Sequence, residues 1–139
     1  RLAEEEAARK AAQTTEVTTV QNTSVAASAD DVTLLAAIIQ CEAGSECYEG
    51  QVAVGAVVMN RLRSGSYPST IYDVIYQKGQ FTPAGSGSVA NVIANGPSAT
   101  CVQAAQEALN GTDNTGGAVS FRRASSGHAG VVIGNHVFY

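Results

Sequence analysis

Hydrophobic residues recur at helical spacing over most of the chain after residue 28 and change to short strand-like runs near the end. In "SADDVTLLAAIIQCE", Leu35, Ile38 and Glu42 fall on one face at i, i+3 and i+7, which predicts a helix. Ser28 and Asp31 have the spacing of a capping box at its start. Glu42 therefore extends an apolar stripe.

Two more helices are predicted next in the chain. The segment "YEGQVAVGAVVMNRLRSG" carries small and β-branched residues that suit close packing, and Gly65 ends it. The segment "YPSTIYDVIYQKGQF" has a helix start at Pro68 or Ser69, apolar residues on one face and a stop at Gly79. We expect the first helix to be buried around most of its circumference and the second to be short.

A stretch rich in Gly, Ser and Asn separates these helices from the last one. "TPAGSGSVANVIANGPS" indicates a long loop with at most one helical turn, and long loops in compact domains often line sites. A clean helix then runs from Ser98 to about Asn110, where Gly111 stops it.

The two ends of the chain differ from this helical middle. "AVSFRR" and "VVIGNHVFY" are short strand candidates, and "ASSGHAG" between them is long enough for a hairpin loop. Helices followed by a small antiparallel element predict an α+β fold, mainly helical. At the start, "RLAEEEAARKAAQ" favours a solvated helix, and the Thr- and Ser-rich stretch after it favours an extended linker or a weak strand. We therefore divide the chain into an N-terminal segment, 1–31, and a folded domain, 32–139.

The distribution of charge narrows the class of partner. The chain has a net charge of -4; residues 1–31 hold three basic against six acidic residues, and residues 32–139 hold five against six. Nucleic acid needs a basic stripe, and the longest basic run here is Arg122-Arg123, so we expect no nucleic acid partner. The nearly neutral charge of residues 32–139 is compatible with a neutral partner such as a sugar polymer. No apolar run reaches the roughly 18 to 20 residues of a membrane span.

The cysteines and histidines match no metal motif. Cys41, Cys47 and Cys101 lack a CxxC pair, and the spacing of His128 and His136 is not that of metal ligands. Two states of the cysteines stay open on this evidence: one disulfide with one odd cysteine, or three buried thiols. We expect neither a metal nor another cofactor.

Glu42 is the acid with the most distinctive placement. Burial of a carboxyl at the end of an apolar helix face disfavours its ionised form and raises its pKa, which keeps it protonated as a general acid near neutral pH. An exposed acid at a helix C-terminus would oppose the helix dipole. Glu46 and Glu49 start the next helix, where acids are favoured for structural reasons, and Glu46 is the nearest second carboxylate for glycoside hydrolysis.

Several pieces of the sequence together resemble a known family. They are "EAGSECYEGQVAVGAVVMNR", "YPSTIYDVIYQKGQF", "CVQAAQEALNG" with "GGAVSF", and "IGNHVFY", in the family's order. The combination resembles the catalytic domain of spore cortex-lytic enzymes and related cell wall hydrolases of spore-forming bacteria, over nearly all of residues 32–139. The resemblance implies a lysozyme-like fold that cleaves peptidoglycan between N-acetylmuramic acid and N-acetylglucosamine.

The same resemblance implies a mechanism and a set of site residues. Glu42 takes the place of the catalytic acid of a lytic transglycosylase, which protonates the glycosidic oxygen and then, as a base, takes the proton of the sugar's C6 hydroxyl. Gln51, Gln80, Phe81 and His136 fall on positions that line or support the groove. We add Glu46 as the nearest carboxylate and Tyr76 as one of several aromatic residues suited to a sugar platform. Cys41 and Cys101 are implied to form a disulfide, and Cys47 is given no role.

We therefore expect an extracytoplasmic bacterial enzyme that acts as a monomer on the glycan strands of peptidoglycan. Residues 1–31 are expected to link it to an upstream wall-binding, coiled or membrane-anchoring segment. Two other functions stay open: a zinc-dependent N-acetylmuramoyl-L-alanine amidase, and a wall-binding module without activity. The sequence does not decide whether the reaction is transglycosylation or hydrolysis. It also does not decide whether the substrate is spore cortex, which contains muramic lactam, or vegetative peptidoglycan.

Overall fold

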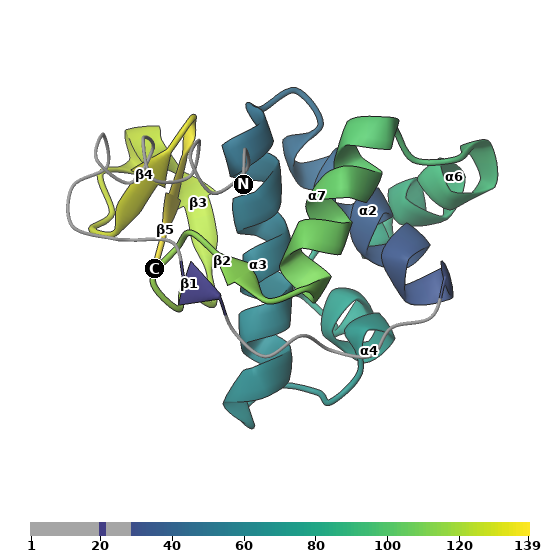
Figure 1. The fold of residues 1–139 in the computed structure, drawn as a ribbon, viewed down its shortest axis with the longest axis horizontal. Helices are drawn as coiled ribbons and strands as arrows, with labels where there is room; N and C mark the ends of the chain where they lie inside the picture. Colours follow the sequence, from purple (N-terminus) through teal and green to yellow (C-terminus); the bar gives the residue numbers. More distant parts are fainter. Residues whose placement is uncertain (1–19, 22–28) are drawn as a thin grey trace.

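Residues 20–21 and 29–139 are described by the computed structural model, and they form a helical body with a small sheet beside it (Figure 1). The helices are α2 (Ala29–Ala43), α3 (Tyr48–Ser64), α4 (Ile71–Tyr76), α5 (Thr82–Gly85), α6 (Ser88–Asn95) and α7 (Ala99–Leu109). The strands are β1 (Val20–Gln21), β2 (Thr112–Asp113), β3 (Phe121–Arg123), β4 (Val131–Ile133) and β5 (His136–Phe138). The helix predicted near the N-terminus, the linker after it apart from Val20–Gln21, and the cap at Ser28 lie outside the described residues.

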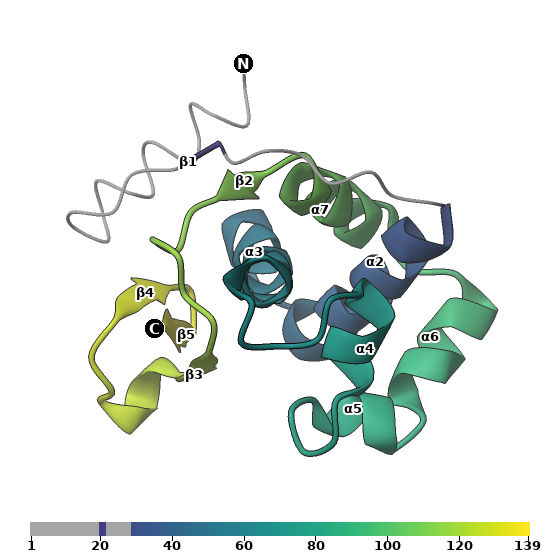
Figure 2. The same cartoon turned by 90° about the horizontal axis from the view of Figure 1, so that it is seen from below.

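Helix α3 runs through the middle of the molecule. Figure 2 shows it between the small sheet on one side and α2 and α7 on the other. Eleven of its 17 residues are buried, as its composition predicted. Gly55 allows the close contact, because a Cβ there would lie 2.9 Å from the Cβ of Ala108 in α7 and 3.1 Å from Cδ1 of Ile39 in α2. The core is therefore built around α3.

The prediction of a long loop is wrong, because residues 82–98 contain two short helices, α5 and α6. Pro83 stands at the start of α5, where its fixed φ suits a helix and its missing N–H removes no helical bond. Gly87, at φ 90°, turns the chain into α6, whose Val89 is fully buried. Val92 and Ile93 follow it at i+3 and i+4, and Val92 also packs against the core, so burial of this apolar face stabilises the short helix.

The other predicted helices are confirmed with smaller corrections. Helix α2 reaches past Glu42 and breaks at residues 44–47, and Gly65 ends α3 in the left-handed conformation at φ 79°. Helix α4 starts later than Pro68 or Ser69, because the hydroxyl of Thr70 accepts the backbone N–H of Asp73 and caps it. In α7, the hydroxyl of Ser98 accepts the backbone N–H of Cys101, as a cap does.

The C-terminal sheet has the strand order β3-β5-β4 and is antiparallel throughout. The predicted hairpin across "ASSGHAG" is wrong, since β3 pairs with β5 and the tight hairpin joins β4 to β5. Gly134, at φ 60°, and Asn135 form its two-residue turn and so split "VVIGNHVFY" into two strands. A second, two-stranded sheet pairs Val20 with Asp113, which is consistent with a weak strand in the N-terminal segment.

The observed architecture confirms an α+β fold, mainly helical, with a small C-terminal antiparallel element. Across the part of the chain that the structure covers, no helix combines the length and the apolar character needed to cross a membrane.

Candidate active site

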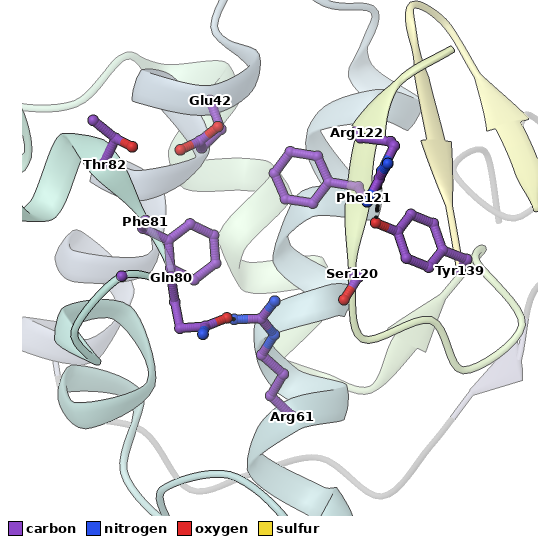
Figure 3. Close-up of a pocket in the computed structure, with 10 residues that line it drawn as sticks. Glu42, Arg61, Gln80, Phe81, Thr82, Ser120, Phe121, Arg122 and Tyr139 are labelled. Carbon is purple, nitrogen blue, oxygen red and sulfur yellow. Dashed lines mark hydrogen bonds between the residues drawn. The ribbon is translucent and has the colours of Figure 1, made fainter. Parts of the chain in front are cut away.

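A pocket of about 440 Å³ opens between the end of α2, the segment that joins α4 to α5, and strand β3 (Figure 3). In Figure 3, Glu42, Phe81 and Thr82 lie on one side of it and Phe121 and the β3 strand lie on the other. The pocket is lined by Glu42, Arg61, Gly79, Gln80, Phe81, Thr82, Ser120, Phe121, Arg122 and Tyr139. Polar and charged groups predominate in this lining, with two aromatic rings facing each other across it.

Glu42 reaches the pocket from the last turn of α2. Its side chain is half-buried, and the loss of hydration raises the pKa of its carboxyl above the ordinary value. Among the described residues that line the pocket, it is the one carboxylic acid. The direction of the pKa shift and its cause are those predicted from the apolar face of the helix.

Arg61 connects the two walls of the pocket from below, where α3 passes under both (Figure 3). Its side chain is 5% exposed; Nε donates to the backbone oxygen of Val119 at 2.6 Å, and Nη1 donates to Oε1 of Gln80 at 3.1 Å. The guanidinium also lies 4.8 Å from the ring centroid of Tyr67 and 5.1 Å from that of Phe81. One buried cation therefore holds the Gln80–Phe81 wall and the approach to β3 at a fixed distance.

The opposite wall is closed by Tyr139. Its backbone N–H donates to the oxygen of Ser120 at 3.0 Å, and its backbone oxygen accepts the N–H of Ser120 at 2.9 Å. Its hydroxyl oxygen accepts a hydrogen bond from Nε of Arg122 at 2.8 Å. Ser120 and Arg122, at the start of the sheet region, thus meet Tyr139, at its end, at the rim of the pocket.

Three of the predicted site residues, Glu42, Gln80 and Phe81, meet in this pocket, and the other four do not line it. Glu46 instead accepts two hydrogen bonds from Asn135, from the backbone N–H at 3.0 Å and from Nδ2 at 3.1 Å. These bonds, the backbone one first, lower the pKa of Glu46. Glu46 thus contacts the β4–β5 turn, and a part in substrate binding stays a prediction.

The remaining predicted binding residues also make contacts outside the pocket. Gln51 is buried and points its Nε2 at the backbone oxygen of Glu46, 3.4 Å away, which supports the break after α2. The ring of His136 stands edge-on to Phe121, with centroids 5.2 Å apart. Tyr76 stacks on the exposed Tyr72 at 4.5 Å. Their roles toward substrate stay predictions.

The three cysteines are free thiols, so the Cys41–Cys101 disulfide is not present in the structure. The pKa of the Cys41 thiol is raised first by burial and then by the charges of Glu42 and Cys101, so Cys101 lies within electrostatic range of Cys41. Cys47 is exposed. In the part of the chain described here, no three His, Cys, Asp or Glu side chains gather where they could hold a metal ion.

Sequence reasoning missed Arg61, Phe121, Arg122 and Tyr139. A signal for Arg61 was available, because Val54, Val57 and Arg61 continue one buried face of α3 at i, i+3 and i+7. A charged residue on such a face needs buried partners, as the bonds to Val119 and Gln80 confirm. The pairing of the last residue with Ser120 has no comparable local signal.

Comparison with known proteins agrees with this geometry. Residues 45–139 match the sequence family described as Cell Wall Hydrolase, a match that begins just after Glu42. The chain belongs to this family. The spore cortex-lytic enzyme of Halalkalibacterium halodurans is 34% identical to it, over 78% of this chain and 34% of the relative. The spore cortex-lytic enzyme of Oceanobacillus iheyensis is also 34% identical, over 80% of this chain and 42% of the relative. The chain therefore spans about a third to two fifths of the length of these relatives.

Solved catalytic domains of SleB proteins share the fold. The catalytic domain of the germination-specific lytic transglycosylase SleB from Bacillus anthracis superposes with a TM-score of 0.71 at 32% identity, over 81% of this chain and 95% of that one. The catalytic domain of the Bacillus cereus SleB protein gives the same score and identity over 86% and 96%. The predicted lysozyme-like fold is thus confirmed.

Proposed function

We propose that this cell wall hydrolase domain is a lytic transglycosylase that cleaves peptidoglycan glycan strands between N-acetylmuramic acid and N-acetylglucosamine. The observation that carries the proposal is Glu42, a half-buried carboxyl with a raised pKa and the one acid among the described residues lining the pocket. The likeness to a catalytic domain named as a lytic transglycosylase supports the same reaction class.

The first proton transfer uses the protonated form of Glu42. Its carboxyl gives a proton to the glycosidic oxygen while the bond from that oxygen to C1 of the muramyl sugar breaks, and the leaving sugar departs as an alcohol. Desolvation keeps the proton on the carboxyl at a pH where an exposed glutamate would have lost it. Positive charge then develops at C1 and the ring oxygen, next to the newly formed carboxylate of Glu42.

The second proton transfer returns the proton to Glu42. The carboxylate takes the proton of the C6 hydroxyl of the same sugar, and that oxygen bonds to C1, which leaves a 1,6-anhydro end. No water is consumed and Glu42 ends the cycle protonated. Since the sugar supplies its own nucleophile, the reaction has no need of a second carboxylate, which is consistent with Glu46 engaged by Asn135.

The other pocket residues bind and position the strand in this proposal. Phe81 and Phe121 face each other across the pocket and offer apolar surfaces to the faces of sugar rings (Figure 3). Gln80 is oriented by Arg61 and presents its amide to sugar hydroxyl groups. Glu46 and Gln51 lie outside the pocket; Gln51 holds the break after Glu42, Glu46 holds the β4–β5 turn, and both act on the site through the backbone in this proposal.

We further infer that the enzyme acts outside the cytoplasmic membrane, where peptidoglycan lies, and that it acts as a monomer. In that oxidising setting we propose that Cys41 and Cys101 form a disulfide, which would fasten the end of α2 to the start of α7.

The test is digestion of purified peptidoglycan, followed by mass analysis of the soluble products. We expect fragments that end in an anhydro sugar, lighter by one water than the ends that hydrolysis leaves. Glu42→Gln should lose turnover, whereas Glu49→Gln, which removes the same charge at the start of α3, should keep it. Hydrolysed ends would refute transglycosylation, and full turnover by Glu42→Gln would refute the role of Glu42.

The same digest decides between this reaction and the two other functions. Release of free peptides that stops when EDTA is added would identify a zinc amidase instead. Binding to the wall without any turnover, by both wild type and Glu42→Gln, would identify a binding module.

A further inference from the structure

The pocket carries more positive than negative charge. Its lining includes two arginines, Arg61 and Arg122, and one acid, Glu42. The charges of these three side chains sum to +1 when Glu42 is ionised and to +2 when Glu42 is protonated and ready to act as an acid. A strand of neutral sugars has no need of this charge, so the arginines call for a separate explanation.

Arg61 has its hydrogen bonds directed within the protein. It is 5% exposed, and it donates to the backbone oxygen of Val119 and to Gln80. Its charge lies beneath the walls of the pocket, where it positions them. A charged group on a ligand would therefore meet Arg122 rather than Arg61.

Arg122 is exposed on β3 and its guanidinium is held in one orientation. Nε donates to the hydroxyl of Tyr139 at 2.8 Å, and the guanidinium carbon lies 5.3 Å from the centre of the same ring. Tyr139 is itself fixed by its two backbone bonds to Ser120 and by stacking on His128, with ring centroids 3.7 Å apart. The arginine is thereby oriented before any ligand arrives, which lowers the entropy lost on binding.

The outer edge of this guanidinium is available for a ligand. Within residues 20–21 and 29–139, the side chain of Arg122 makes one hydrogen bond, from Nε to Tyr139, so both terminal nitrogens keep their donors. Two parallel N–H groups of this kind match the two oxygens of a carboxylate. The neighbouring Arg123 does not line the pocket.

We propose that Arg122 binds a carboxylate on the muramyl residue, so that the site prefers glycan strands whose muramic acid keeps an ionised carboxyl. The inference rests on the proposed function. The carboxylate belongs either to the lactyl group itself or to a peptide stem attached to it, and both offer Arg122 the same chemistry. In a muramic lactam the lactyl carboxyl is used up in an amide ring, and a sugar of that kind would leave Arg122 without this partner.

The test measures binding without turnover. Glu42→Gln protein is titrated in a calorimeter with tetrasaccharides of alternating N-acetylglucosamine and N-acetylmuramic acid, one set with free lactyl carboxyls and one with peptide stems. Each set is also prepared with its carboxyls converted to neutral amides. The titrations are repeated with Arg122→Gln and, as a control of equal charge change on the adjacent residue, with Arg123→Gln, both in the Glu42→Gln background.

We expect the ionised form of at least one set to bind about fivefold to tenfold more tightly than its amide, because water at this exposed site weakens the pair of charge-assisted hydrogen bonds. Arg122→Gln should remove this preference and Arg123→Gln should keep it. Arg122→Lys should retain part of it, because an ammonium keeps the charge and loses the paired donors. The set that shows the preference identifies which carboxyl is bound.

Equal binding of ionised and amidated ligands would overturn the proposal, and so would a preference that survives Arg122→Gln. Since the readout is binding, the result does not depend on bond cleavage. A wild-type protein that prefers the ionised ligand and never cleaves it would overturn the proposed function and leave the role of Arg122 supported. Unaltered thermal unfolding of the Arg122 variants excludes loss of fold as the cause.

Discussion

Replacement of Arg61 by lysine tests whether one buried cation sets the distance between the walls of the pocket. The arginine donates to Val119 on the side of β3 and to Gln80 on the other wall. An ammonium group is compact and cannot reach both acceptors from one position, although it keeps the positive charge. We expect Arg61→Lys to retain one of the two contacts and to leave the other wall without its anchor.

The size of the effect follows from the bond that is lost. A hydrogen bond from a charged donor contributes about 1.5 to 3 kcal/mol, so the free energy of unfolding should fall by about 2 kcal/mol. In a domain of this size such a loss lowers the Tm by about 8 °C. Displacement of Gln80 and Phe81 by a fraction of an ångström should slow glycan cleavage by about tenfold to a hundredfold.

The assay combines thermal unfolding with the rate of release of soluble fragments from peptidoglycan. Arg63→Lys is the matched control, because Arg63 lies two residues further along α3, is exposed, and keeps its positive charge toward Asp113 as a lysine. We expect this exchange to change stability by less than about 0.5 kcal/mol. If Arg61→Lys keeps both the Tm and the cleavage rate of wild type, the two walls are not positioned by Arg61.

Three further predictions concern Glu42, the β4–β5 turn and the cysteines. Desolvation raises the pKa of Glu42 in the folded state, so the favourable contribution of its protonated form is present at low pH and is lost as the pH rises through the folded pKa. The Tm of Glu42→Gln should therefore equal that of wild type at about pH 4 and exceed it toward neutral pH. A difference in Tm that stays constant with pH would contradict this. Gly134→Ala should lower the free energy of unfolding by about 2 kcal/mol in urea titrations, since the residue has φ 60° and its new Cβ would lie 2.5 Å from Oε1 of Glu46; wild-type stability would show that the turn adjusts without cost. Mild oxidation should join Cys41 to Cys101, seen as a linked peptide pair after proteolysis, and raise the Tm; a mass spectrum with both thiols still free would disprove the pairing.

The parts of the fold that were predictable are those where local spacing and burial agree. Helix α2 and the placement of Glu42 follow from an apolar stripe of period 3.6, and α7 follows from a cap at Ser98 and a stop at Gly111. The site residues found in advance, Gln80 and Phe81, came from resemblance to a family rather than from any local pattern. Residue types alone do not say that a glutamine will stand beside a buried arginine.

The parts that failed depend on contacts between distant segments. Residues 82–98 are rich in Gly, Ser and Asn, which hide the helical spacing of Val89, Val92 and Ile93, and α6 is stabilised because Val89 is buried in the helical body. The strand order of the sheet depends on a two-residue turn at Gly134 and Asn135; the Gly-Asn pair is a hairpin signal, but it does not indicate that β3 will join β5. Tyr139 reaches the site because it pairs with Ser120, 19 positions earlier. Tertiary contacts of this kind are decided by packing, and one sequence contains little direct sign of them.

Strand β5 is the middle strand of the β3-β5-β4 sheet, although it follows every other described element along the chain. During synthesis on the ribosome, α2, α3 and α7 emerge first and can pack while β5 is still in the exit tunnel. At that stage Glu42 is already on its helix, but β3 and β4 have no strand to join them and the wall with Arg122 cannot form. A chain that stopped before His136 would carry the acid without the groove. Translation through β5 is thus the step that completes the groove beside Glu42.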